Sequence, residues 1–307
     1  MAAEHPNAAA TAGPRELTLV RQGEHWTARF VAMVCPCEVL IEIVPEATAR
    51  RIADAAAAGA WRVEAKFSRY RSNNIVDTIN NANGSAVCVD DETANLLDLA
   101  ATLTRLSGGR FDITSGVLRR VWAFDGGDRI PAQQQIDALR HLIGWEKVSW
   151  QRPMLRLLPD MQIDFGGIGK EYAVDLAVQD AHRIAPGASC LVNFGGDVAI
   201  RNPRRDGKPW RIGVESSHAG MASRILSVYR GGVATSGDSR RYVLKDGIRY
   251  SHVLDARTGW PVESAPSSVT VLADTCTQAG SFTTLAMLEG PGAEDFLKGE
   301  GVAYWLQ

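Results

Sequence analysis

Apolar and polar residues follow one another along this chain in two rhythms, one typical of helices and one typical of strands. Helical spacing predicts four longer helices, over residues 46–65, 91–106, 170–184 and 276–290, and a shorter one over 131–143. Runs rich in β-branched residues predict strands over 28–44, 147–151, 154–158, 190–194, 210–215, 222–229 and 267–273. Residues 241–255 predict a β-hairpin with a Lys-Asp-Gly turn, and 67–80 a polar loop. Because strands outnumber strand–helix–strand alternations, we expect an α+β fold.

The same pattern indicates one long folded unit. No repeat or linker divides the chain, so residues 17–307 are expected to form a single domain. Residues 1–16 are rich in Ala and weakly hydrophobic, and we expect them to be a disordered leader. The leader does not resemble a secretory signal, and no apolar run is long enough to span a membrane. The sequence as it stands therefore favours the cytoplasm, or the periplasm if an export signal was removed.

Composition excludes several classes of function. The formal net charge is −2, so no basic field predicts nucleic-acid binding. The chain has five cysteines, an odd number that argues against a disulfide framework and fits a reducing compartment. Cys35 and Cys37 have no second Cys or His pair nearby, so a zinc site is not expected.

The stretch IDFGGIGKEYAVD, residues 163–175, has distinctive local chemistry. Asp164 precedes a loop with three glycines, and Lys170 begins a predicted helix. The loop is not a Walker A motif, because Glu171 follows Lys170, and it is not a dinucleotide fingerprint, because Tyr172 stands at the third glycine. Backbone N–H groups at a helix N-terminus, together with a lysine, can hold an anion. Taken alone, a structural turn explains the loop at least as well.

His252 is the histidine with the most distinctive surroundings. It lies in RYSHVLDARTGWP, between apolar positions and three residues before Asp255. One interpretation is a core histidine that is hydrogen-bonded to a neighbour. The other is a general base, because imidazole titrates near neutral pH.

Six segments in order give the chain a specific resemblance. They are FSRYRSNNIVDTIN, SGGRFDITSGVLRRVWAF, IDFGGIGKEYAVD, LVNFGGDV, VATSGDSRRY and YSHVLDARTGWPV. Together they resemble the ApbE family of FAD:protein FMN transferases, whose patterns include LDLGGIAKGYAVD and, nearer the C-terminus, MxADAxxT. The resemblance implies T-fold-like mixed sheets packed with helices, with FAD in an elongated cleft. It also implies an activity, in which the FMN half of FAD is transferred to a Thr or Ser hydroxyl of a partner flavoprotein and AMP is released.

This implied reaction is phosphoryl transfer, which needs charge neutralisation and in-line positioning. A Mg²⁺ ion with oxygen ligands suits that chemistry. The implied cofactors and partners are therefore FAD as substrate, Mg²⁺, and an acceptor flavoprotein with a Thr/Ser flavinylation motif.

The family's patterns can be carried over position by position. The residues implied to bind FAD are Met33, Tyr70, Arg110, Phe111, Asp112, Asp164, Lys170 and His252. Asp164 and His252 are also the implied catalytic residues, with His252 deprotonating the acceptor hydroxyl. The implied metal ligands are the carbonyl of Gly167, with Thr283 and Thr284, one through its carbonyl and one through its hydroxyl.

Three positions depart from the family's patterns. Val34 and Cys35 replace Gly-Thr, which alters the wall expected on the flavin side, and Glu171 replaces a glycine. Most importantly, Gly280 stands at the acid of MxADAxxT, which is the main carboxylate of the metal. Without that acid, Mg²⁺ binds weakly unless the FAD phosphates and another acid compensate. The acids considered for this role are Asp274 and Asp255.

The departure at Gly280 leaves two further functions open. One is an FAD-binding protein with weakened or lost transferase activity, which serves as a flavin carrier or scaffold. The other is an FAD pyrophosphatase, in which water takes the place of the acceptor hydroxyl and the products are FMN and AMP.

On this alignment, a Gly280→Asp variant should gain affinity for Mg²⁺, because the substitution returns a carboxylate to the metal site. The affinity can be measured by titrating the metal into both proteins. A variant that gains no affinity would show that the metal site has been placed wrongly.

Overall fold

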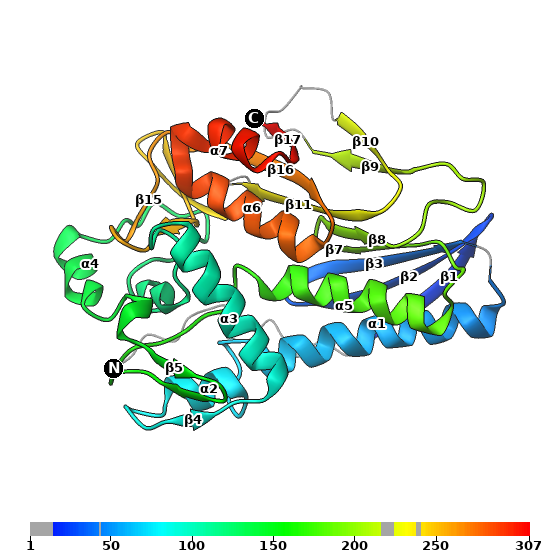
Figure 1. Cartoon of the computed structure of the whole chain (residues 1–307). Coiled ribbons are helices and arrows are strands. Elements are labelled where there is room, and N and C mark those ends of the chain that lie inside the picture. The colour runs from blue at the N-terminus through cyan, green and yellow to red at the C-terminus, as the bar shows by residue number, and fades with distance from the viewer. Residues whose placement is uncertain (1–14, 43, 216–223, 238–240) are drawn as a thin grey trace.

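The computed structural model describes residues 15–42, 44–215, 224–237 and 241–307. An eight-stranded sheet runs through this part of the chain in the order β1-β2-β3-β7-β8-β11-β16-β17, and its neighbouring strands are antiparallel (Figure 1). The strands are β1 (Thr18–Gln22), β2 (His25–Ala32), β3 (Cys35–Glu42), β7 (Cys190–Phe194), β8 (Asp197–Ile200), β11 (Gly231–Gly237), β16 (Ser268–Ala273) and β17 (Ala303–Leu306). The predicted α+β class is confirmed.

Long helices cover one face of this sheet. Helices α1 (Glu46–Phe67) and α5 (Gly169–Ile184) lie side by side on the part formed by β2, β3 and β7, while α6 (Cys276–Glu289) and α7 (Ala293–Glu300) lie towards β16 and β17 (Figure 1). The hairpin of β9 (Trp210–Val214) and β10 (Arg224–Val228) shares a second apolar cluster with β7 and β8. In β7, Val192 packs in the helix-side core and Leu191 in the hairpin-side cluster. Burial on both faces makes a strand a continuous apolar run, which is why β7 was predictable.

A second group of elements packs near the C-terminal end of α1 (Figure 1). It contains α2 (Ile75–Asn80), α3 (Asp91–Leu106), the 3₁₀ helix η1 (Ile113–Arg120), α4 (Gln133–Arg140), η2 (Trp145–Lys147) and the small sheet of β4 (Val87–Cys88), β5 (Ser149–Gln151) and β6 (Met154–Arg156). The remaining elements are β12 (Tyr242–Lys245), β13 (Ile248–Ser251), β14 (Leu254–Asp255), β15 (Trp260–Pro261) and η3 (Gly290–Gly292).

The helices were predicted well and several strands were not. Helix α3 has the predicted bounds and ends where Gly108 and Gly109 adopt positive φ angles of 58° and 82°. The hairpin of β12 and β13 turns at Lys-Asp-Gly as predicted. The prediction of a loop over 67–80 was incomplete, because α2 lies within it. Strands β1, β8, β11 and β17 and helix α7 were not predicted from the pattern.

The prediction of one strand over 28–44 was wrong, because β2 and β3 form a hairpin that turns at Met33 and Val34. Both residues have positive φ, 51° and 59°, which is the geometry of a tight primed turn. The sequence carries no Gly, Asn or Asp there, so no turn signal was present. A β-branched residue with positive φ is strained. Val34 is 65% exposed, so its side chain makes little packing that could offset this strain.

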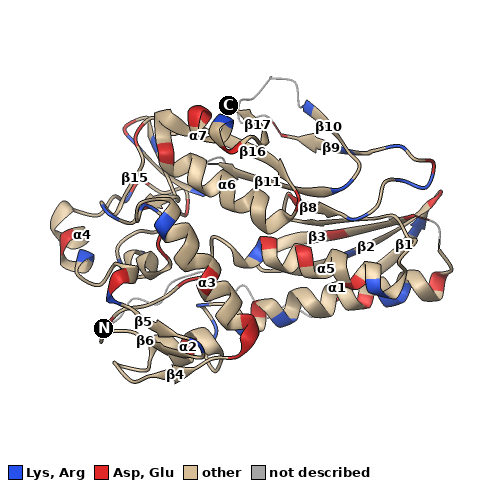
Figure 2. Cartoon of the chain, viewed as in Figure 1, with Lys and Arg blue, Asp and Glu red and all other residues tan. Residues whose placement is uncertain are grey.

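The described elements carry charges of both signs and include no candidate membrane-spanning helix (Figure 2). In the described ranges no helix is both long and apolar enough to cross a bilayer. Lys and Arg are interspersed with Asp and Glu along the elements (Figure 2). Residues 1–14 of the predicted leader lie outside the described residues, so that prediction stays a prediction, as does the single domain.

Replacing Val34 with glycine should raise the free energy of unfolding by about 1 kcal/mol, because glycine adopts positive φ without a Cβ clash. Urea unfolding of the two proteins measures this change. Val31→Gly is the matched control: Val31 is similarly exposed, at 67%, but lies inside β2, where glycine should be destabilising. Equal effects of the two substitutions would contradict the turn geometry.

Candidate active site

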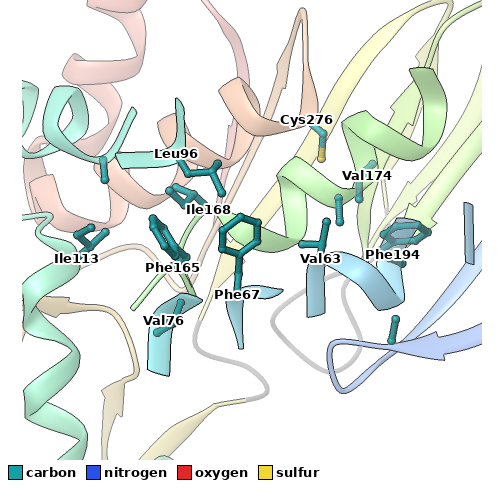
Figure 3. Close-up of a cluster of buried hydrophobic side chains, with 14 of the residues drawn as sticks. Val63, Phe67, Val76, Leu96, Ile113, Phe165, Ile168, Val174, Phe194 and Cys276 are labelled. Atoms are coloured by element: carbon teal, nitrogen blue, oxygen red, sulfur yellow. The ribbon is translucent and has the colours of Figure 1, made fainter. Parts of the chain in front are cut away.

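The glycine-rich loop before α5 is anchored from beneath by apolar side chains. Ile163, Phe165 and Ile168 are at most 1% exposed. Phe165 packs edge-on against Phe67 of α1, with 5.4 Å between ring centroids (Figure 3). The side-chain amide of Asn80 both donates to the carbonyl and accepts from the N–H of Ile163. The loop therefore presents its glycines and the start of α5 in a fixed position.

Lys170, in the first turn of α5, forms an ion pair with Asp197 at the start of β8. The Nζ–Oδ2 distance is 2.5 Å, and the Asp197 side chain is only 2% exposed. Burial by itself would lower the pKa of Lys170, but the carboxylates of Asp197 and Glu171 outweigh it and raise the pKa above its ordinary value. The ammonium group is therefore held charged next to a helix N-terminus, where anions bind.

Gly195 has no side chain to occupy the narrow space between Cys35 and this ammonium group. A Cβ on Gly195 would lie 2.8 Å from Cβ of Cys35 and 3.9 Å from Nζ of Lys170. Gly195 also has a positive φ of 64° in the turn between β7 and β8. Sterics and backbone conformation therefore both require glycine here.

Glu171 brings a second carboxyl group to the same place. Its Oε2 atom is buried and has no hydrogen-bond partner among the described residues. Burial, followed by repulsion from Asp197, raises the pKa of Glu171 to about 8. One ammonium group thus stands beside two carboxyl groups, so ionising both leaves one buried negative charge uncompensated.

Helix α6 faces these residues in a register that Asp175 sets. The Asp175 carboxylate accepts hydrogen bonds from the backbone N–H groups of Cys276 and Thr277, both 2.8 Å, and from the Thr277 hydroxyl at 2.6 Å. It therefore caps α6 from α5. Gly280 follows one turn later, and a Cβ there would lie 2.5 Å from Cγ of Glu171.

This contact corrects the expectation for Gly280→Asp. An aspartate at position 280 would collide with Glu171, so the single substitution should not produce a working metal ligand. The two acids considered as compensation are also placed unfavourably. Asp255 is bound by its neighbour Arg257 at 2.7 Å, and Asp274 is exposed. Glu171 is the acid that lies against Gly280.

Asp164 is held by Arg69, a residue that the sequence analysis did not select. Arg69 donates to Oδ2 of Asp164 at 3.2 Å and to the carbonyl of Gly116 at 2.8 Å. The other oxygen of Asp164 accepts the N–H of Gly166 at 2.9 Å. Three sequence motifs therefore meet at the Arg69 guanidinium, which fixes the loop. A catalytic role for Asp164 stays a prediction.

The surroundings of His252 fix its tautomer and its charge. Its Nδ1 lies 3.2 Å from the carbonyl oxygen of Arg241, which can only accept, so Nδ1 carries the hydrogen and Nε2 keeps a lone pair. Burial, followed by the charges of Arg241 and Arg119, lowers the pKa of His252 to about 4. The ring is therefore neutral at pH 7, which is the state a general base needs.

Four of the other predicted residues differ in their contacts with the rest of the protein. The Asp112 carboxylate is 5% exposed and accepts from Thr114 and from the N–H of Trp145, which indicates a structural role. Arg110 pairs with Glu289. Phe111 lies beside Gly167, where a Cβ would be 3.1 Å from its ring. The FAD contacts of Asp112, Arg110 and Phe111 and the metal contact of Gly167 stay predictions.

The remaining predicted residues line the turn, a surface loop and α6. Met33 lies in the strained β2–β3 turn described above. Tyr70 lies on the surface, with 63% of it exposed. Thr283 is fully buried, and its hydroxyl contacts Ser236 and the carbonyl of Gly280, both at 2.9 Å. Thr284 is half-buried. The hydroxyl of Thr283 is thus engaged, which leaves metal binding through hydroxyl to Thr284 under the original hypothesis.

Comparison with known proteins shows which family has this sequence and fold. The model of the ApbE family matches residues 33–306. The chain belongs to the ApbE family. It is 31% identical over 235 residues to the FAD:protein FMN transferase of Vibrio cholerae, covering 74% of this chain and 70% of the relative. It is 30% identical over 253 residues to that of Escherichia coli K12, covering 78% and 72%.

Solved structures of ApbE proteins have the same fold. The ApbE protein of Thermotoga maritima superimposes with a TM-score of 0.84 at 30% identity, covering 92% of this chain and 94% of that one. The apo flavinyl transferase ApbE of Pseudomonas stutzeri has a TM-score of 0.78 at 28% identity, covering 95% and 91%.

Two residues of this site lie in the ApbE motifs but were not among the predicted site residues. Asp197 belongs to the segment LVNFGGDV, and Arg69 to FSRYRSNNIVDTIN. The signal for Asp197 was an acid that directly follows an apolar strand and two glycines. Nothing local to positions 69 and 164, which are far apart in sequence, indicated that they would pair.

Loss of His252 should change how stability depends on pH. Between a folded pKa of about 4 and the ordinary 6.5, the folded chain binds fewer protons than the unfolded chain, so its free energy of unfolding falls as pH falls through this window. His252→Gln should lose less stability than the parent between about pH 7 and about pH 4.5. Urea unfolding at both pH values measures this difference, and equal losses would contradict a buried neutral imidazole.

Proposed function

We propose that this chain transfers the FMN half of FAD to a Thr or Ser hydroxyl of a partner protein and releases AMP. The observation that supports this most directly is the ion pair of Lys170 with buried Asp197 at the N-terminus of α5. A fixed ammonium group and a helix N-terminus together attract a pyrophosphate and stabilise the charge that develops during phosphoryl transfer.

In the proposed reaction the acceptor oxygen bonds to the phosphorus of the FMN half. The bond between that phosphorus and the bridging oxygen breaks, and AMP leaves with the electron pair. Nε2 of His252 takes the proton of the acceptor hydroxyl, and Lys170 balances the negative charge on the phosphate oxygens. Asp164, held by Arg69, keeps the loop in place around the nucleotide.

Mg²⁺ belongs to the proposal because the donors here are hard oxygens and Oε2 of Glu171 is buried without a partner. When bound, the ion would neutralise the pyrophosphate. No group of three or more His, Cys, Asp or Glu in the described part of the chain could hold a metal by itself. Phosphate oxygens of FAD would therefore complete the ligand set, as is usual for magnesium at such sites.

The activity can be tested with FAD, Mg²⁺ and an acceptor protein that carries the Thr/Ser motif. The acceptor should gain the mass of a phosphoester-linked FMN, with one AMP released for each transfer. Lys170→Gln should lower the turnover number by about 10²- to 10³-fold, because it removes a charge-stabilising group. Lys298→Gln is the control, since Lys298 is 58% exposed in a surface pair with Glu294.

Two results would overturn the proposal. Release of FMN and AMP without a mass gain on the acceptor would make water the acceptor. Absence of FAD binding in a fluorescence titration would exclude both the transferase and the flavin-carrier interpretation.

A further inference from the structure

Glu171 and position 280 compete for the same volume between α5 and α6. A Cβ at Gly280 would lie 2.5 Å from Cγ, 3.1 Å from Cδ and 3.3 Å from Oε1 of Glu171. The first distance is shorter than real Cβ contacts, so a side chain at 280 and the observed Glu171 exclude each other. Glu171 therefore fills the space into which a side chain on α6 would point.

The register between α5 and α6 holds Glu171 opposite Gly280. Asp175, one turn after Glu171, caps α6 through the N–H groups of Cys276 and Thr277. Gly280 lies one turn after Cys276, so α5 and α6 run past each other in opposite directions here. Two pairs of positions, 171 with 280 and 175 with 276, are thereby matched across the contact.

The charge balance shows that this carboxyl group lacks a partner. Glu171 Oε2 is buried without a donor among the described residues, because the group beside it is the carboxyl of Asp197, which already holds the ammonium of Lys170 at 2.5 Å. A buried carboxylate that lacks a partner is costly, so such groups call for a ligand or an ion. A hard divalent cation satisfies the unpaired oxygen and balances the negative charge that the carboxyl group gains when the ion takes the place of its proton.

We propose that Glu171 is the carboxylate ligand of the divalent cation, delivered from α5 into the space that Gly280 leaves open on α6. The acid that is missing from one helix is thus supplied by the helix opposite. This inference rests on the proposed function and names the residue that completes its metal site.

The test measures metal affinity directly, with Mn²⁺ as the probe because it prefers the same oxygen ligands. Free Mn²⁺ is followed by electron paramagnetic resonance in the presence of saturating ADP, which contains a pyrophosphate but no FMN to transfer. Glu171→Gln should weaken Mn²⁺ binding by at least about tenfold, because the side chain keeps its shape but can no longer ionise to a carboxylate.

Asp91→Asn is the matched control for Glu171→Gln. Asp91 is an exposed acid in the first turn of α3, where its charge interacts favourably with the helix dipole. If Glu171 serves only the dipole of α5, both variants lower the melting temperature and neither changes the Mn²⁺ affinity. That result would overturn the proposal.

The reciprocal exchange Glu171→Gly with Gly280→Asp gives a second, independent test. It removes the collision and places a carboxylate in the same space from α6, so Mn²⁺ affinity should return to within about threefold of the parent, about 0.7 kcal/mol. Gly280→Asp alone should bind Mn²⁺ poorly or fail to fold. If the double variant folds but binds Mn²⁺ no more tightly than Glu171→Gly alone, the carboxylates at positions 171 and 280 do not reach the same place.

Failure of this inference can be told apart from failure of the proposed function. If the parent does not bind FAD, the function is wrong. If the parent binds FAD but binds no Mn²⁺ with ADP, the metal site is wrong as a whole. If Glu171→Gln binds Mn²⁺ as tightly as the parent, only the assignment of Glu171 is wrong.

Discussion

The site depends on the close contact between helices α5 and α6, which is set by one carboxylate. Asp175 is 8% exposed and accepts three hydrogen bonds from the first turn of α6. Charge-assisted bonds of this kind are stronger than neutral ones, and they leave no freedom to slide one helix along the other. This cap fixes the register of α6 on α5, and that register places Gly280 against Glu171.

The same contact explains why the chemistry can be concentrated at the beginning of α5. Apolar side chains hold the preceding loop from below, so its backbone is free to face a ligand. Lys170 and Asp197 meet because β8 begins beside the start of α5, and burial of Asp197 strengthens their attraction. The pair keeps its charge, while Glu171 retains an oxygen that the protein itself does not satisfy.

Departures from a family pattern are easier to interpret in pairs than singly. In the sequence, Glu171 and Gly280 looked like two unrelated changes, one adding a carboxylate and one removing it. In three dimensions they occupy one volume, so each makes the other possible. A glycine beside a larger side chain is a common packing solution, and here the larger side chain is also charged.

Local pattern by itself determined helices α1, α3, α4, α5 and α6, the β12–β13 hairpin and the glycine-rich loop, because each depends on interactions between residues close in the chain. Ordered motifs determined the family and hence most of the candidate residues. Only the tertiary structure decided that Met33 and Val34 form a turn, that Arg69 holds Asp164, and that Glu171 lies against Gly280. These outcomes depend on sterics and electrostatics between segments up to about a hundred residues apart, and neither leaves a period or spacing in the sequence.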